Sequence, residues 1–163
     1  MPLKRVFLGL GTNLGDREAN LDRALTALEA EHIHILRKSS VYETEPQDVK
    51  EQPWFLNMVV ECESRYFPLQ LLSVVHRIER ELGRERGSRA IPKGPRLIDI
   101  DILLFGSVSI TTPKLTIPHP NMMNRRFVME PLLEIAPDLR HPVTGKLIRE
   151  ALVKVARQQL RRR

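Results

Sequence analysis

Residues 94–106 read GPRLIDIDILLFG, and the part from 97 to 105 has the composition of a buried β-strand. Asp99 and Asp101 interrupt this apolar run. Because side chains on a strand alternate between its two faces, both aspartates point the same way, with Cβ atoms roughly 7 Å apart. Ile100 and its isoleucine neighbours point the other way and are predicted to enter a hydrophobic core.

Two carboxylates on one face of an apolar strand need an explanation. An unpaired buried carboxylate is strongly disfavoured, two close carboxylates repel each other, and aspartate is depleted in strands. One interpretation is a half-exposed strand whose polar face happens to carry acids. The other is a magnesium site, since Mg²⁺ is bound by a few carboxylate oxygens together with substrate phosphates.

The segments around this strand form an ordered series. Strands are expected at 6–10, 33–43, 54–63 and 97–105, and helices within 15–30 and 68–82. Asp16 is the expected N-cap of the first helix, and Gly83 is expected to end the second. The order βαββαβ is the ferredoxin-like arrangement, of the α+β class, and it predicts an antiparallel sheet with two helices on one face.

The remaining residues are predicted to add C-terminal helices to this core. Residues 115–127 are expected to be irregular, and 125–136 to form a helix that ends at Pro137. Residues 146–160 have the pattern of an amphipathic helix. These helices are expected to cover other sheet surface or an edge, and the arginines at 161–163 to be solvated.

Composition fits one soluble globular domain that spans residues 1–163, since 42% of the residues are hydrophobic and 28% are charged. No run has the length of a transmembrane segment or the form of a signal peptide. The single cysteine, Cys62, is predicted to be a core thiol, so we expect a cytoplasmic protein. The net charge of +6 permits nucleic acid, an acidic membrane surface or a phosphate-rich small molecule as partner.

Two connections are longer than the elements they join require, at 44–53 and 83–96. The second is strongly basic and includes Arg84 and Arg96. Loops of this length in a compact domain are typical of lids or binding segments, and both are expected to lie near the aspartate strand.

Three further features have more than one interpretation. The run GLGTNLG at 9–15 lacks the spacing of a dinucleotide fingerprint, so its glycines are predicted to allow close approach of a ligand or a strand. Asn57 faces inward on its strand, where it either bridges backbone groups or binds the edge of a planar heterocycle. Glu79 lies at the edge of an apolar helix stripe, where it either extends its carboxylate to solvent, pairs with an arginine, or binds a polar ligand such as a ribose.

Four stretches together carry a family resemblance, namely SSVYETEP, FLN, GPRLIDIDILLFG and LTIPHPNMMNRRFVMEPLLEIAP. With them the chain resembles the 6-hydroxymethyl-7,8-dihydropterin pyrophosphokinases of the folate pathway over nearly its whole length. The resemblance implies a ferredoxin-like fold. It also implies transfer of the pyrophosphoryl group of ATP to the hydroxymethyl group of the pterin, with release of AMP.

The resemblance also assigns residues to roles. It makes Asp99 and Asp101 the ligands of two Mg²⁺ ions and adds Arg84 and Arg96 as catalytic residues that engage the triphosphate. The positions that match the pterin pocket are Thr44, Pro46, Phe55, Asn57 and Phe127. The positions that match the ATP site, besides the two loop arginines, are Glu79, Lys114, Thr116, His119 and Arg125.

Two other functions compete with this one. A basic ferredoxin-like module that binds nucleic acid would carry aromatic residues on the open sheet face, where this chain places aspartates. A different Mg²⁺-dependent phosphotransferase would act on another heterocycle. We expect a monomeric enzyme that binds ATP and a reduced pterin and associates with neither nucleic acid nor membrane.

Overall fold

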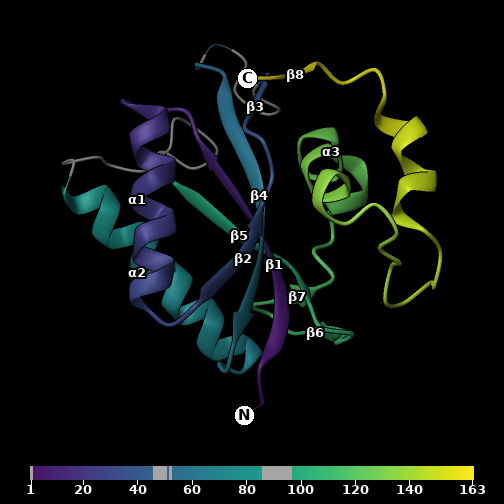
Figure 1. The fold of residues 1–163 in the computed structure, drawn as a ribbon, viewed down its shortest axis with the longest axis horizontal. Helices are drawn as coiled ribbons and strands as arrows, with labels where there is room; N and C mark the ends of the chain where they lie inside the picture. Colours follow the sequence, from purple (N-terminus) through teal and green to yellow (C-terminus); the bar gives the residue numbers. More distant parts are fainter. Residues whose placement is uncertain (1, 46–50, 52, 86–96) are drawn as a thin grey trace.

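The computed structural model describes residues 2–45, 51, 53–85 and 97–163, and their strands and helices form a layered arrangement (Figure 1). In chain order the elements are β1 (Lys4–Thr12), α1 (Arg17–Ala30), β2 (His34–Lys38), β3 (Tyr42–Thr44), β4 (Phe55–Ser64), α2 (Pro68–Glu85), β5 (Asp99–Phe105), β6 (Ile110–Thr111), β7 (Thr116–Ile117), the 3₁₀ helix η1 (Met122–Asn124), α3 (Arg126–Ile135), the 3₁₀ helix η2 (Ile148–Val155) and β8 (Leu160–Arg162).

The main sheet is antiparallel, with strand order β5-β1-β4-β3-β8 and with β2 also paired to β4. β6 and β7 form a separate two-stranded sheet. β2 and β3 together take the place of the second strand of the βαββαβ series, and β1 and β4 lie in the middle of the sheet. This arrangement confirms the predicted ferredoxin-like α+β core. None of the helices in the described part of the chain combines the length and apolar character that a membrane-spanning segment needs.

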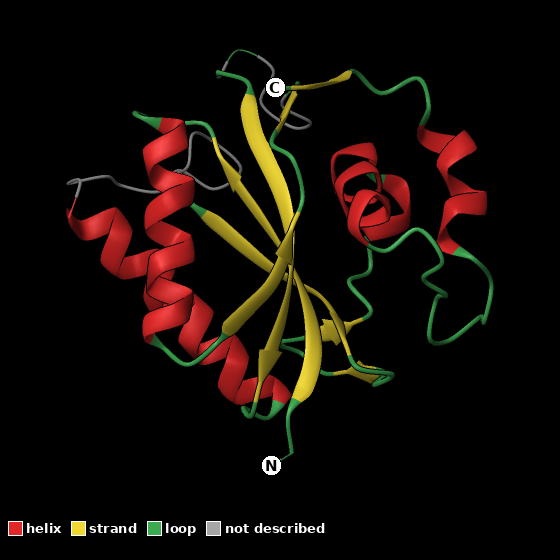
Figure 2. Cartoon of the chain, in the orientation of Figure 1, coloured by secondary structure: helices red, strands yellow, loops and turns green. Residues whose placement is uncertain are grey.

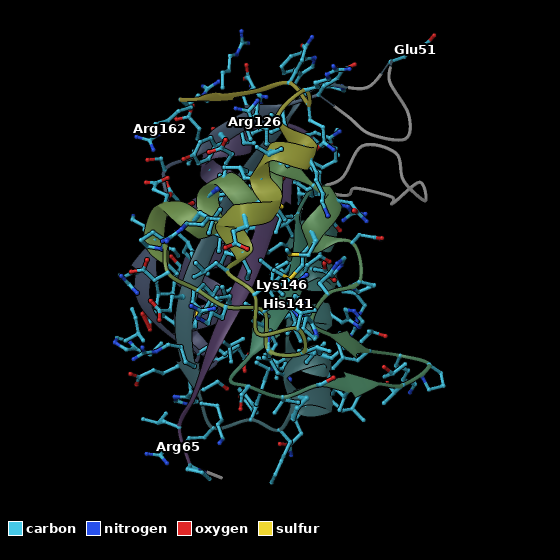
Figure 3. The ribbon with its side chains drawn as sticks, turned by 90° about the vertical axis from the view of Figure 1, so that its right-hand side faces the viewer. Glu51, Arg65, Arg126, His141, Lys146 and Arg162 are labelled. Atoms are coloured by element: carbon cyan, nitrogen blue, oxygen red, sulfur yellow. The ribbon has the colours of Figure 1, made fainter. Side chains whose placement is uncertain are left out.

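Each face of the sheet is covered by its own layer (Figure 2). α1 and α2 pack on one face, where Leu8 and Ile100 belong to the larger hydrophobic core. α3 and η2 lie on the opposite face, in front of the sheet in Figure 3, and Phe7 and Val59 pack with Met129 of α3 in a second core. The late helical segments therefore cover the second sheet face, as predicted.

The ends of the first two helices differ in how well the sequence predicts them. The Asp16 carboxylate accepts a hydrogen bond from the Ala19 amide at 3.2 Å and caps α1, as expected. α2 continues through Gly83 to Glu85, so the prediction that Gly83 ends the helix is wrong. Gly83 does not adopt a positive φ, and a glycine in helical geometry costs only about 1 kcal/mol relative to alanine.

The single strand predicted at 33–43 is in fact two strands, β2 and β3, which both pair with β4. The interruption lies at Ser39, whose amide donates to the Val59 carbonyl at 2.9 Å. The Ser39 hydroxyl in turn accepts from the Val59 amide at 2.9 Å. A side-chain oxygen thus replaces the backbone acceptor of a regular ladder, and the strand breaks there while its position next to β4 is kept.

The prediction of an amphipathic helix at 146–160 is also wrong. Only η2 is helical in this stretch, with Ile148 and Val155 buried as the apolar pattern requires. The Gln158 side chain then binds the start of α3, because it donates to the Asn124 carbonyl at 2.8 Å and accepts from the Arg126 amide at 2.8 Å. These bonds hold the chain away from a helical path and lead it into β8.

The three arginines at 161–163 are not a solvated tail. Residues 160–162 form β8, which pairs antiparallel with β3, so that Tyr42 lies opposite Arg162 and Glu43 opposite Arg161. Arg161 and Arg163 bind the Glu43 carboxylate, and Arg162 lies 3.6 Å from Glu134 of α3. Backbone pairing and acidic partners together order a segment whose composition alone is typical of disorder.

The Cys62 thiol gives a direct test of this fold. Cys62 is fully buried in β4, and burial, with smaller effects from Glu29 and Glu61, raises the pKa of the thiol to about 12. Because neither access nor a thiolate exists in the folded state at pH 8, we expect alkylation by iodoacetamide to be at least about a thousandfold slower than in denaturant. Quenched labelling followed by mass spectrometry measures both rates. Comparable rates in native and denaturing buffer would contradict the buried placement of β4.

Candidate active site

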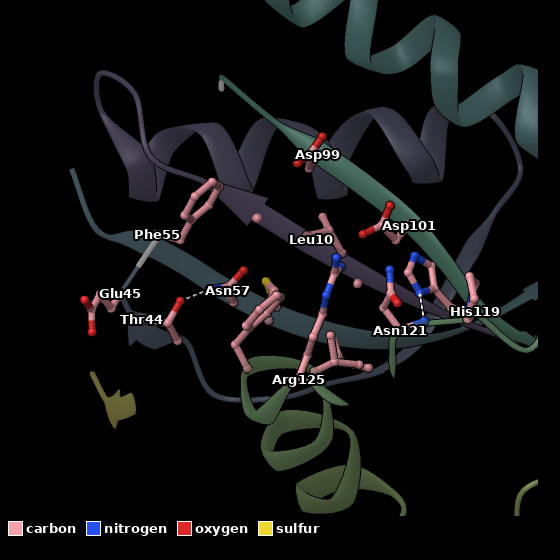
Figure 4. Close-up of a pocket in the computed structure, with 17 residues that line it drawn as sticks. Leu10, Thr44, Glu45, Phe55, Asn57, Asp99, Asp101, His119, Asn121 and Arg125 are labelled. Atoms are coloured by element: carbon pink, nitrogen blue, oxygen red, sulfur yellow. Dashed lines mark hydrogen bonds between the residues drawn. The ribbon is translucent and has the colours of Figure 1, made fainter. Parts of the chain in front are cut away.

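A cavity of about 390 Å³ opens on the α3 side of β5, β1 and β4 (Figure 4). Strands, the segment before η1 and the start of α3 all contribute to its wall. Its lining residues are Gly9, Leu10, Gly11, Thr44, Glu45, Phe55, Asn57, Met58, Val59, Asp99, Asp101, His119, Pro120, Asn121, Arg125, Phe127 and Val128.

Asp99 and Asp101 project from β5 into this cavity (Figure 4). Both are half-buried, while Ile100 between them is buried on the other face, as the alternation in the sequence predicts. In the sheet Asp99 lies opposite Gly11 and Asp101 opposite Gly9. Because neither glycine has a side chain, both carboxylates border open space above β1.

The backbone between the two aspartates is held from behind the sheet. The Glu79 carboxylate of α2 accepts a hydrogen bond from the Ile100 amide at 2.8 Å. A charged acceptor makes a stronger bond than a neutral carbonyl. Glu79 therefore anchors the start of β5 to α2 at the one residue that separates the two acids.

Asn57 forms the opposite side of the cavity, on β4. Its Nδ2 donates to Thr44 Oγ1 at 2.6 Å, which fixes the orientation of the amide group. Gly11 lies beside it on β1, and a Cβ at position 11 would come within 2.8 Å of Asn57 Oδ1 and 3.5 Å of the Phe55 ring. The glycine is thus required for the packing of Asn57 against β1.

The start of α3 brings a cation and an aromatic ring into the same cavity. Arg125 is the N-cap residue of α3, and its carbonyl accepts hydrogen bonds from the Val128 and Met129 amides. Its guanidinium group lies 5.6 Å from the centroid of the Phe127 ring and reaches toward the cavity (Figure 4). Phe127 and Phe55 contribute aromatic surface from two different elements.

His119 and Asn121 close the side of the cavity next to Asp101 (Figure 4). The His119 amide donates to the Leu103 carbonyl at 3.0 Å, which ties this segment to β5. The Asn121 amide donates to His119 Nδ1 at 3.1 Å, so the neutral ring carries its proton on Nε2. Burial lowers the pKa of His119 below its ordinary value, outweighing the opposite effect of Asp101, and the ring is neutral at pH 7.

The carboxylates in the cavity do not by themselves form a complete site for a divalent cation. No group of three or more histidine, cysteine, aspartate or glutamate side chains with metal-binding geometry occurs in the described ranges 2–45, 51, 53–85 and 97–163. Two neighbouring carboxylates on one strand face are nevertheless what Mg²⁺ uses when substrate phosphates and water complete its shell. The residues present fit a cation bound together with a phosphate ligand rather than a complete protein cage.

The structure brings together most of the residues that the sequence singled out. Eight of them line the cavity, namely Thr44, Phe55, Asn57, Asp99, Asp101, His119, Arg125 and Phe127. Three described residues do not, namely Glu79 on α2, Lys114 between β6 and β7, and Thr116 on β7. Pro46, Arg96 and the side chain of Arg84 lie outside the described residues.

Sequence reasoning missed Glu45 and Asn121, which also line the cavity, and the contact of Gly11 with Asn57. Asn121 directly follows the segment IPHP, so its place beside a rigid proline-flanked histidine was the available signal. Nothing in the sequence alone indicates that Gly11 and Asn57 meet, because the contact depends on the register between β1 and β4.

Comparison with known proteins identifies a family. The model of the 7,8-dihydro-6-hydroxymethylpterin-pyrophosphokinase (HPPK) family matches residues 7–137. This match confirms the resemblance that the sequence motifs indicated. Pyrophosphoryl transfer from ATP to hydroxymethyldihydropterin is the reaction of that family.

Individual relatives of the chain are also folate-synthesis proteins. The chain is 43% identical over 159 residues to the folic acid synthesis protein fol1 of Schizosaccharomyces pombe, covering 97% of this chain and 21% of that protein. It is 39% identical over 154 residues to the 2-amino-4-hydroxy-6-hydroxymethyldihydropteridine pyrophosphokinase of Bacillus subtilis, covering 94% of this chain and 90% of that protein. The chain thus spans about a fifth of the fungal relatives and nearly all of the bacterial one.

A solved structure supports the fold. The HPPK-DHPS protein of Plasmodium falciparum superposes with a TM-score of 0.75 at 20% identity, covering 94% of this chain and 45% of that one. At that identity the likeness speaks for the fold alone, and the family follows from the sequence matches. The family model and the match to a bacterial pyrophosphokinase along nearly all of its length show that the chain belongs to the HPPK family, the ATP-dependent diphosphokinases of folate synthesis.

Proposed function

We propose that this chain transfers the pyrophosphoryl group of ATP to the hydroxymethyl group of 6-hydroxymethyl-7,8-dihydropterin in the cavity between β5, β4 and α3. One observation carries the proposal: two aspartates and an oriented asparagine with flanking aromatic rings share a single cavity. The acids suit a cation with phosphate, and the amide with its rings suits a planar heterocycle. The two halves meet across β1, as a transfer between two substrates requires.

The pterin is assigned to the half that contains Asn57, Thr44, Phe55 and Phe127. The Thr44 hydroxyl already takes one Nδ2 proton of Asn57, so the remaining amide proton and Oδ1 are available to the donors and acceptors on a pterin edge. Phe55 and Phe127 supply the apolar faces between which a flat ring stacks. Pro46, which the family resemblance also assigns to this pocket, lies outside the described residues.

The triphosphate is assigned to the half that contains Asp99, Asp101, His119 and Arg125. Two carboxylates would repel an ATP triphosphate, so Asp99 and Asp101 are proposed to hold two Mg²⁺ ions bound with the nucleotide. When bound, the ions supply neutralisation of phosphate charge and a lower pKa for the attacking hydroxyl. Arg125 adds a fixed positive charge, and the neutral His119 offers its Nε2 proton as a hydrogen-bond donor.

The reaction needs no covalent intermediate with the protein. A bond forms between the pterin hydroxymethyl oxygen and the β-phosphorus of ATP, and the bond from that phosphorus to the α–β bridging oxygen breaks. The hydroxyl proton passes to solvent, and AMP leaves with the bridging oxygen. Positioning and charge neutralisation are the main contributions a protein makes to such a transfer.

The remaining nucleotide contacts are assigned by the family resemblance. Glu79, Lys114 and Thr116 are proposed to bind ATP from beyond the cavity wall. Arg84 and Arg96 are proposed to engage the triphosphate. We further propose one domain over residues 1–163, acting as a cytoplasmic monomer on small molecules without nucleic acid or membrane.

The nucleotide product separates this function from its two rivals. Purified protein with ATP, Mg²⁺ and the reduced pterin alcohol is expected to release AMP. ADP would instead identify a phosphotransferase of another kind. Release of neither nucleotide would favour a binding module.

Removing either carboxylate tests the metal assignment. Asp99→Asn and Asp101→Asn are expected to lower kcat at least about a hundredfold at saturating Mg²⁺, because several kcal/mol of charge neutralisation are lost. The fold is expected to remain, since each change also relieves repulsion between the two acids. Asp138→Asn is the control, since Asp138 is exposed and pairs with Arg149 away from the cavity. Activity above a few per cent in either active-site variant would refute the assignment.

The pterin pocket is tested by Asn57→Ala and Gly11→Ala. Loss of the amide leaves polar ring edges unpaired, which costs about 1–3 kcal/mol, so the pterin Kd is expected to rise by about 5- to 150-fold. An added methyl at position 11 displaces the Asn57 oxygen and is expected to have the same selective effect. Gly9→Ala is the control for pterin affinity, since its Cβ meets only the Leu103 side chain, at 3.5 Å. Equal losses of pterin and ATP affinity in calorimetry would mean that Asn57 is structural.

Two changes at Glu79 separate its contact with β5 from its proposed contact with ATP. Glu79→Ala removes the acceptor of the Ile100 amide and is expected to cost about 1–3 kcal/mol of stability. Glu79→Gln keeps an acceptor, so its melting temperature is expected to stay near that of the wild type. Its KM for ATP is expected to rise about three- to tenfold, because ribose hydroxyls donate more strongly to a carboxylate than to an amide. A wild-type KM in Glu79→Gln would restrict Glu79 to anchoring β5.

A further inference from the structure

The sheet has a cluster of charged groups behind the proposed pterin pocket, on the opposite face. Thr44 and Phe55 line the cavity, and because strand side chains alternate, Glu43 points to the α1 side. The Trp54 ring lies under the guanidinium group of Arg161, which also binds Glu43. The Glu43 side chain is 9% exposed and faces Arg17 of α1 at 3.4 Å. Glu43 directly precedes Thr44, and Trp54 directly precedes Phe55, so each is the sequence neighbour of a residue that lines the pocket.

Arg161 of β8 connects Glu43 with Trp54, and Arg163, which directly follows β8, also binds Glu43. Arg161 Nε donates to Glu43 Oε1 at 2.9 Å, and its guanidinium carbon lies 5.3 Å from the centroid of the Trp54 ring. Arg163 donates to Glu43 Oε2 at 2.9 Å and also binds Glu18 of α1. The Arg161 guanidinium group therefore bridges Glu43, near the end of β3, and Trp54, the residue before β4.

α1 completes the arrangement. Arg17 Nη1 donates to the Trp54 carbonyl at 2.9 Å, so Trp54 is held by its backbone as well as by its ring. Hydrogen bonding from Arg161 is the main cause that lowers the pKa of Glu43 below its ordinary value. Glu43 is therefore ionised at neutral pH, and the contact is a charged one.

Among the described residues, β3 pairs with β4 from Tyr42, which lies opposite Asn57, to Thr44, which lies opposite Phe55. Thr44 is the last residue of β3, and Phe55 is the first residue of β4. The contacts of Arg161 with Glu43 and Trp54 lie at these two strand ends. They hold together the two strand ends that carry Thr44 and Phe55.

We propose that Arg161, with Glu43 and Trp54, positions the pterin pocket from the opposite face of the sheet, so that pterin affinity depends on β8 although β8 does not line the cavity. The inference rests on the proposed function, since it assumes that Thr44 and Phe55 bind the pterin. Arg161 is a positioning residue in this scheme and touches neither substrate. β5, which carries Asp99 and Asp101, is separated from β4 by β1 and lies farther still from β3 and β8, so the nucleotide half is expected to be insensitive to these contacts.

The variants for the test are Arg161→Ala, Arg161→Lys, Glu43→Gln and the control Arg162→Ala. Arg162→Ala removes one positive charge from β8, as Arg161→Ala does. The Arg162 side chain, however, faces Tyr42 and Glu134 on the α3 side. Tyr42 keeps its own hydrogen bond to Glu134, at 2.7 Å, when Arg162 is absent. Arg161→Lys keeps the charge but loses the planar group that stacks on Trp54 and binds through more than one nitrogen.

Calorimetry measures two affinities for each variant: that of a non-hydrolysable ATP analogue with Mg²⁺, and that of the reduced pterin alcohol with the analogue already bound. Arg161→Ala and Glu43→Gln are expected to raise the pterin Kd about three- to tenfold and to leave the analogue Kd within about twofold. Arg161→Lys is expected to lie between Arg161→Ala and the wild type, and Arg162→Ala to match the wild type. Combining Arg161→Ala with Glu43→Gln is expected to add little, because both changes break the same contact.

Several outcomes would overturn the inference. Unchanged pterin affinity in Arg161→Ala and Glu43→Gln would show that β8 only stabilises the sheet, and so would equal losses of both ligands. An equal effect of Arg162→Ala would show that charge, rather than position, is responsible. Should Arg161→Ala unfold, Arg161→Lys and Glu43→Gln, which keep most of the packing, decide the question by the same criteria. Wild-type protein that fails to bind the pterin would overturn the proposed function itself, which separates the two failures.

Discussion

The pairing of β1 with β4 on one side and β5 on the other is the constraint on which the rest of the structure depends. Gly11 lies opposite Asn57 in one ladder and opposite Asp99 in the other. Adjacent strands are about 4.8 Å apart, so this register sets Asn57 and Asp99 roughly 10 Å from each other across one glycine. That spacing suits a fused heterocycle whose side arm points toward the two acids that we propose to hold Mg²⁺. A shift of one residue in either ladder would turn one of these side chains into the core.

Glycine in the middle of a strand is unfavourable by about 0.5–1 kcal/mol relative to alanine, and β1 contains two. Leucines alternate with the glycines along β1, and burial of the leucine side chains offsets the cost of the glycines. Leu8 and Leu10 are buried against the α1 and α2 layer, while Gly9 and Gly11 face the cavity. The same strand therefore contributes core packing with one set of residues and open space with the other. Residues from β4 and β5 can reach that space because β1 does not fill it.

The sequence predicts the parts of this protein that depend on local periodicity. The alternation around Asp99 and Asp101, the cap at Asp16 and the βαββαβ order each follow from residues close together in the chain, and the structure has them all. The predicted end of α2 at Gly83 failed because a glycine in a helix costs little, whereas the predictions at the C-terminus failed because distant partners override the local pattern. Gln158 is bound at the start of α3, and residues 161–163 are ordered by pairing with β3 and by acids of β3, α1 and α3, so an apparent helix and an apparent tail become η2 and β8. A long-range contact of this kind leaves no periodic signal in the sequence.

The candidate site likewise has a part that the sequence predicts and a part that it does not. The residue types that suit a cation and a heterocycle are visible in the chain, but the contacts that orient them come from elsewhere in the fold. Asn57 is oriented by Thr44 on the neighbouring strand, and the backbone between Asp99 and Asp101 is held by Glu79 from the opposite face. Both contacts act on groups that are themselves attached to paired strands. Strand pairing thus sets where these side chains lie, and contacts from outside the cavity set how they are turned, so substitutions behind the sheet are expected to change affinity for the proposed substrates without touching them.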